Sequence, residues 1–147
     1  MRVTFLGTGT SHGIPVIGCH CPVCTSTDSR DKRYRSSILV EDRGSRIVVD
    51  TGYEFRLQLL RENIDHLDAV LYTHSHADHL SGIDDLRVFS QKKNMTVYSN
   101  GPTLKYIETH YSYAFDESSY PGNPHLCAVE LAPLESVSIA GINVIPL

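Results

Sequence analysis

The feature that most constrains this chain is a run of metal-binding side chains directly after a short apolar segment. Residues 69–72 read Ala-Val-Leu-Tyr, which is typical of a buried strand. Four candidate ligands follow within six residues: His74, His76, Asp78 and His79. In an extended segment His74 and His76 can point the same way and share one metal. Asp78 and His79 lie on the following turn and can reach a second metal.

This cluster predicts a two-metal centre at the end of a strand. Neutral imidazole and carboxylate ligands suit zinc, manganese or iron. Asp78, the carboxylate of the cluster, is also the candidate catalytic residue. The alternative is a polar loop that is rich in histidine by chance, but four ligands in this order argue against it.

A second group of candidate ligands lies near the N-terminus, where Cys19, Cys21 and Cys24 fall within six residues. Thiolates at this spacing can wrap a tetrahedral zinc, which needs a fourth ligand from elsewhere. His12 and His20 lie close in the sequence, but both are cramped. Three reduced structural cysteines are the alternative. Because such crowding suits a metal site in a reducing compartment better than disulfides, we expect a cytoplasmic location.

Length and charge limit the remaining function classes. The 147 residues are enough for one domain, residues 1–147, but not for two. Lys and Arg number 13 against 17 Asp and Glu, a net charge of −4, and no basic stretch predicts a nucleic-acid partner. No apolar run approaches a membrane span, so we expect no membrane partner. The apolar pattern of residues 141–147 stops without a polar cap, so we expect the domain to be incomplete at its C-terminus.

The apolar periodicity predicts a sheet covered by helices. Strands are expected in eight short segments: residues 2–6, 37–40, 46–49, 69–72, 96–99, 126–131, 137–139 and 142–145. Helices are expected at residues 55–60, 80–89 and, after a Pro-containing start, 102–111. A loop rich in Pro, Gly and Ser is expected at residues 117–124. Strand pairs mixed with strand–helix alternation indicate an α/β or α+β fold.

The motif His-x-His-x-Asp-His at a strand end resembles the signature of the metallo-β-lactamase superfamily. The resemblance implies that His74 and His76 bind the first metal and that Asp78 and His79 bind the second. Asp50, followed by Thr and Gly, matches the strand-end aspartate of that superfamily. It would orient the histidine loop by hydrogen bonds without binding metal, and a turn or cap role is the alternative. The implied fold is the N-terminal part of a four-layer αββα sandwich.

The cysteine run and four further segments resemble the PhnP-like branch, the phosphoribosyl cyclic phosphodiesterases and their relatives. The segments are residues 6–15, 34–37, 50–56 and 81–87. In that branch the three cysteines hold a structural zinc, with a histidine from the C-terminal part as fourth ligand. That histidine has no counterpart here. The third histidine on the first metal, the bridging aspartate and the final histidine of the branch also have none.

The resemblance implies a metal-dependent hydrolase, most closely a phosphodiesterase. A zinc or manganese pair would activate hydroxide to cleave a small, cyclic phosphodiester. A tRNase Z-like ribonuclease is the competing enzyme, and a relative in quinone-cofactor biosynthesis ranks below it. A third alternative is a catalytically incomplete metal-binding fragment. Such a chain would have little activity alone and an unpaired strand through which two copies could associate.

Overall fold

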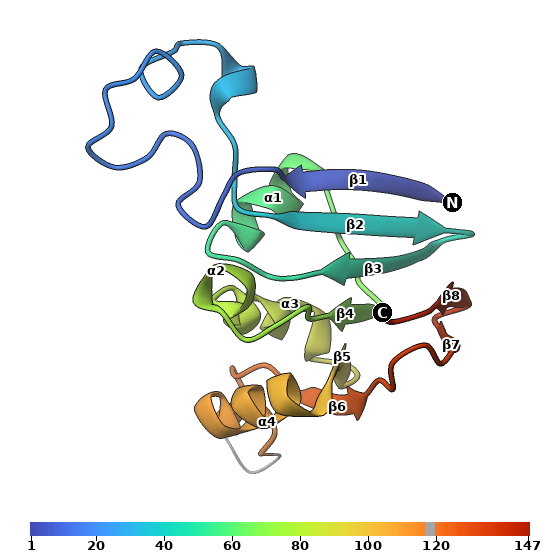
Figure 1. Ribbon diagram of the computed structural model, residues 1–147. Helices are drawn as coiled ribbons and strands as arrows, with labels where there is room; N and C mark the ends of the chain where they lie inside the picture. The colour runs from blue at the N-terminus through green and yellow to red at the C-terminus, as the bar shows by residue number, and fades with distance from the viewer. Residues whose placement is uncertain (117–119) are drawn as a thin grey trace.

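The computed structural model describes residues 1–116 and 120–147 as a mixed sheet flanked by helices (Figure 1). Residues 117–119, inside the loop expected at 117–124, lie outside the described residues. The main sheet has the strand order β1 (Arg2–Gly7), β2 (Ser37–Asp42), β3 (Ser45–Val49), β4 (Ala69–Leu71), β5 (Met95–Ser99) and β6 (Leu126–Glu130). A separate hairpin is made of β7 (Val137–Ile139) and β8 (Ile142–Val144).

Antiparallel pairing joins β1 to β2 and β2 to β3, whereas β3, β4, β5 and β6 run parallel. Parallel neighbours need long crossovers, and each crossover here contains helix. The helical elements of these crossovers are α1 (Phe55–Arg61), α2 (Ala77–Leu80), η2 (Ile83–Leu86), α3 (Arg87–Ser90), α4 (Gly101–His110) and η3 (Ser112–Ala114). A further short helix, η1 (Ser29–Asp31), lies in the loop between β1 and β2. The carboxyl ends of β3, β4 and β5 therefore meet at one edge of the sheet, where ligands bind in open α/β sheets.

The hairpin between β2 and β3 closes through a two-residue turn. Arg43 and Gly44 have φ angles of 49° and 92°, as a type I′ turn requires. The expected hairpin is confirmed. Its strands are longer than predicted, because the turn takes only two residues and the pairing extends to Asp42 opposite Ser45.

The two faces of the sheet are covered differently. Helices pack on one face, where the buried cluster includes Phe55, Ile83 and Ile107 against Leu39, Val48 and Val97. On the other face the β7–β8 hairpin places Ile139 and Ile142 against Ile47 and Ala69. None of the helices in the described residues is long and apolar enough to cross a membrane.

The helix expected at residues 80–89 is wrong in detail, because three short elements, α2, η2 and α3, replace it. The break falls at Gly82, whose backbone N–H donates to the carbonyl of Thr51 at 2.7 Å. A Cβ on Gly82 would lie 2.5 Å from the carbonyl oxygen of Gly52 and 2.6 Å from Cβ of Phe55. This close packing against the segment after β3 prevents a regular helix.

Gly82→Ala should therefore destabilise the fold by about 1–3 kcal/mol, because the added methyl meets backbone that cannot move aside. Urea unfolding measures the change. Gly101→Ala is the matched control: its Cβ would meet the side chain of Glu130, which can rotate away. Equal stability losses in the two variants would contradict the steric explanation.

Candidate metal centre

The histidine loop leaves the carboxyl end of β4 and enters α2, so the four predicted ligands gather at the sheet edge. The His74 ring centroid lies 4.6 Å from that of His76 and 4.1 Å from that of His79. Oδ2 of Asp78 lies 3.3 Å from Nε2 of His79. Among the described residues, Cys19, Cys21 and Cys24 are the one group of three or more candidate ligands whose ligand atoms all lie within 4.8 Å of one another. The histidine-loop ligands are more widely spread, an arrangement compatible with two metal positions.

Asp50 holds this loop in place from the end of β3. Its Oδ1 accepts the backbone N–H of Thr73 at 2.8 Å, and its Oδ2 accepts the Thr73 hydroxyl at 2.8 Å. Oδ2 also faces Nδ1 of His79 at 2.7 Å. The residue is 4% exposed and has a φ of 64°, a left-handed conformation that aspartate tolerates better than most residues. The Asp50 carboxylate therefore contacts both the backbone of the loop, at Thr73, and one ring nitrogen, Nδ1 of His79.

These hydrogen bonds fix which ring nitrogens are free. A carboxylate only accepts, so Nδ1 of His79 carries the proton and leaves Nε2 for a metal. The Thr73 hydroxyl donates its proton to Asp50. Its oxygen therefore accepts a hydrogen bond from Nδ1 of His74, 2.9 Å away. Nε2 of His74 is likewise left for a metal. Burial, followed by the neighbouring rings of His79 and His76, lowers the pKa of His74 and favours its neutral, metal-binding form.

The segment after Asp50 packs directly on the histidine loop. The backbone N–H of Thr51 donates to the carbonyl of His79 at 2.8 Å. A Cβ on Gly52 would lie 2.4 Å from the carbonyl oxygen of Asp78, so only glycine permits this approach. Backbone contacts and the Asp50 carboxylate thus position the loop together.

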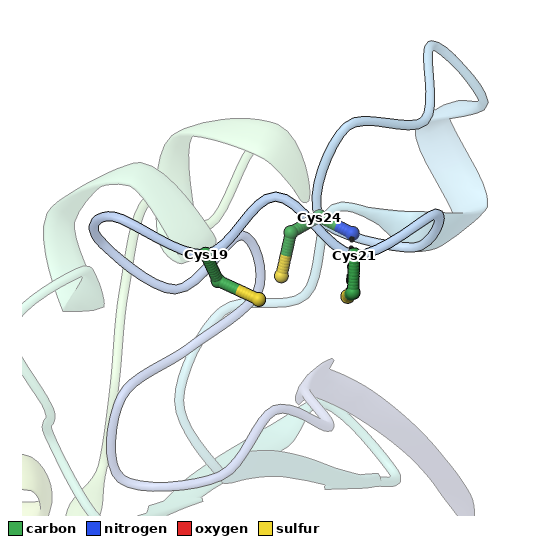
Figure 2. Close-up of side chains that lie close together, drawn as sticks. All are labelled: Cys19, Cys21 and Cys24. Atoms are coloured by element: carbon green, nitrogen blue, oxygen red, sulfur yellow. Dashed lines mark hydrogen bonds between the residues drawn. The ribbon is translucent and has the colours of Figure 1, made fainter.

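The three cysteines lie in the long loop between β1 and β2, which projects beyond the end of the sheet (Figure 1). Figure 2 shows their sulfur atoms facing a common space, and they lie within 4.8 Å of one another. The backbone N–H of Val16 donates to Sγ of Cys24 at 3.4 Å, and that of Cys24 donates to Sγ of Cys21 at 3.5 Å. The Cys24 N–H, followed by the thiols of Cys19 and Cys24, lowers the pKa of Cys21 to about 7.

This donor set fits a tetrahedral zinc, because the three sulfurs lie close together and backbone N–H groups donate to those of Cys21 and Cys24. Neither His12 nor His20 joins the three sulfurs in the described structure, and both side chains are exposed. The fourth ligand of the cysteine site is therefore not assigned among the described residues.

Sequence reasoning missed Thr73 and Arg35. Thr73 relays hydrogen bonding from His74 to Asp50, and Arg35 contacts both the cysteine loop and the segment after Asp50. Thr73 precedes the first ligand, which was the available signal. The contacts of Arg35 join distant residues, and no spacing rule indicates them.

Comparison with known proteins identifies the family. Residues 45–147 match the family described as a beta-lactamase superfamily domain. The chain belongs to the beta-lactamase superfamily. It has the metallo-β-lactamase fold, and it corresponds to the N-terminal part of the superfamily members that it matches.

Three relatives show how far this superfamily member is similar to known proteins. An octanoyltransferase of Porphyromonas gingivalis is 45% identical over 148 residues, which cover 100% of this chain and 30% of that protein. The coenzyme PQQ synthesis protein B of Methylobacterium radiotolerans is 36% identical over 101 residues, covering 59% of this chain and 34% of that protein. A solved diphosphatase of the PhnP family superposes with a TM-score of 0.85 at 36% identity, covering 97% of this chain and 54% of that chain.

The resemblance to the PhnP-like branch is confirmed by this superposition. The expected fold class, the N-terminal part of the metallo-β-lactamase sandwich, is confirmed as well. The chain spans about a third of the length of the curated relatives and about half of the diphosphatase.

Asp50→Asn should weaken metal binding at the histidine loop by about 10- to 100-fold, the usual effect of removing a carboxylate behind a ligating histidine. Asparagine also tolerates the left-handed backbone, so the fold should persist. Competition with a chromophoric chelator measures the affinity. Asp65→Asn, at an exposed carboxylate that contacts Arg46 and His66, is the control and should bind metal as the parent does. Unchanged affinity in Asp50→Asn would contradict the role of Asp50.

Cys21→Ser should remove zinc from the cysteine loop, because one of three converging thiolates is lost. Elemental analysis of purified protein measures bound zinc. Cys127→Ser is the matched control, since Cys127 is an exposed cysteine on β6, outside the cluster. Equal zinc content in both variants would rule out a cysteine-loop site.

Proposed function

We propose that this protein is a metal-dependent hydrolase that cleaves a small phosphodiester, with a cyclic phosphodiester as the preferred class. The observation that supports this best is the network from Asp50, which keeps the protons on Nδ1 of His74 and His79 and leaves their Nε2 atoms available to a metal. The 36% identity to a PhnP-family diphosphatase supports chemistry at phosphorus.

In this proposal His74 and His76 hold one ion, and Asp78 and His79 hold the second. Divalent ions bound here supply Lewis acidity, which acidifies water and neutralises charge that develops on phosphoryl oxygens. The chain's own residues set the geometry: Asp50 keeps the proton on Nδ1 of His79, and Thr73 keeps it on Nδ1 of His74. Asp78 is the catalytic residue of the proposal, because it is the carboxylate of the cluster and its Oδ2 lies 3.3 Å from Nε2 of His79.

A cavity of about 380 Å³ borders the histidine loop at Tyr72 and Thr73. Ser99 at the end of β5, Asn100 after it and residues 144–147 also line this cavity, whereas the four proposed metal ligands do not. This volume is in the range of small-molecule sites. The net charge of −4 and the absence of a basic run in the sequence disfavour a folded RNA, so the small phosphodiester is preferred to a tRNase Z-like substrate.

Hydrolysis of bis-p-nitrophenyl phosphate tests the proposal. Protein loaded with zinc or manganese should release p-nitrophenolate, and removal of the metal by a chelator should abolish the release. The 147-residue chain alone is expected to be slow, because it supplies two ligands to each proposed metal, so rates are compared between variants under one metal condition.

His79→Ala should lower this rate by more than the roughly 10- to 100-fold typical of outer-shell changes, because it removes a ligand directly. His110→Ala is the matched control: His110 lies at the end of α4, where its ring contacts the carbonyl of Tyr106. Turnover that survives both chelation and His79→Ala would refute the proposed function.

A further inference from the structure

Arg35 connects the cysteine loop to the body of the domain. It lies just before β2, at the far end of the loop that holds the three cysteines. Its Nε donates to the carbonyl oxygen of Ser11 at 2.8 Å, near the start of the same loop. The guanidinium therefore holds the two ends of the cysteine loop together.

The same guanidinium is bound on another side by the segment that follows Asp50. Its Nη1 donates to Oε1 of Glu54, and the backbone N–H of Arg35 donates to Oε2 of Glu54 at 3.3 Å. Its Cζ lies 4.6 Å from the ring centroid of Tyr53, a cation–π contact. The side chains of Arg35 and Glu54 are each 20% exposed, so loss of one leaves the other poorly hydrated and unpaired.

That segment touches the histidine loop. Gly52 lies between Arg35 and Asp78: a Cβ there would be 3.5 Å from Cβ of Arg35 and 2.4 Å from the carbonyl oxygen of Asp78. The neighbouring Thr51 donates to the carbonyl of His79 at 2.8 Å. A shift of this segment would therefore move the backbone of both ligands proposed for the second metal.

On the side of the cysteines, backbone contacts continue from the sulfur atoms toward Arg35. The N–H of Val16 donates to Sγ of Cys24. Ile14 and Arg33 exchange two backbone hydrogen bonds of 2.8 Å, and they lie three residues after Ser11 and two residues before Arg35. Ordering of the sulfurs by a metal would thus order the loop ends that Arg35 joins.

We propose that Arg35 is a positioning residue that couples the two metal sites: metal at the cysteines raises the metal affinity of the histidine loop, and the reverse. The inference rests on the proposed function, because it needs metal in both places. Couplings between protein sites typically change affinity by about 5- to 150-fold, and linkage makes the change equal in both directions. We expect about ten-fold here, because the connection is a short chain of direct contacts.

Cobalt titration separates the sites. Co²⁺ bound by thiolates absorbs in the near ultraviolet through sulfur-to-metal charge transfer, whereas Co²⁺ bound by histidine and carboxylate shows only weak visible bands. The histidine-loop affinity is measured in the parent and in Cys19→Ser/Cys21→Ser, each with and without Arg35→Gln. Loss of the cysteines should weaken the histidine loop about ten-fold when Arg35 is present and have no further effect when it is absent.

Three further variants keep the test specific. Arg33→Gln is the matched control and should preserve the coupling, because the exposed Arg33 side chain hydrogen-bonds the hydroxyl of Thr8 at 3.1 Å, away from Glu54. Arg35→Lys keeps the charge, but an ammonium group cannot reproduce the planar guanidinium contacts to both Ser11 and Glu54. This variant should therefore retain only part of the coupling between the two metal sites. Glu54→Gln weakens the pair from the other side and replaces Arg35→Gln if that variant does not fold. A purely structural role would lower stability in urea and leave the affinity ratio unchanged.

The outcomes distinguish this inference from the proposed function. The coupling is overturned if the cysteine substitutions leave the cobalt affinity of the histidine loop unchanged. It is also overturned if they weaken that affinity equally in the presence and absence of Arg35. Either result leaves the proposed function intact. No cobalt at the histidine loop of the parent protein overturns both. A ten-fold ratio that disappears with Arg35 and survives in Arg33→Gln supports the coupling.

Discussion

The arrangement of the histidine loop depends on one buried carboxylate. Asp50 accepts from the backbone and hydroxyl of Thr73 and from His79, and it does so from a left-handed backbone position at the end of β3. Such a conformation persists only where surrounding contacts determine it. Here the N–H of Asp50 donates to Leu71 at 2.8 Å, and its carbonyl accepts the Ser37 hydroxyl at 2.9 Å. The sheet therefore fixes the backbone conformation of Asp50, and the Asp50 carboxylate in turn orients the His79 ring directly and the His74 ring through Thr73.

Close backbone packing extends this order to the rest of the site edge. Gly52 and Gly82 let three segments approach one another: the one after β3, the histidine loop and the start of η2. The contacts are between main-chain atoms, so their geometry tolerates little adjustment. Arg35 connects the cysteine loop to these segments through Ser11 and Glu54. One rigid edge thus serves both groups of candidate ligands.

The sequence predicted most of what is local and little of what is long-range. The β2–β3 hairpin follows from apolar runs around Arg43-Gly44, and the histidine loop from ligands that are consecutive in the chain. The cysteine cluster was visible for the same reason, and the structure brings its sulfurs together. The break at Gly82 was not predicted, because it results from packing against Gly52 and Thr51. The fourth ligand of the cysteine site would likewise require a residue distant in sequence.

Asp50 and His79 are 29 residues apart, and they meet only when β3 and β4 are paired. An unfolded chain offers the same ligands without the carboxylate that selects the proton position on the ring. Metal bound by the histidine loop would therefore favour the native state strongly over the unfolded one. A ligand that binds only the native state adds about 2.7 kcal/mol to apparent stability at one hundred times its dissociation constant. With metal bound there, the melting temperature of this domain would be governed by the free metal concentration as well as by its amino-acid sequence.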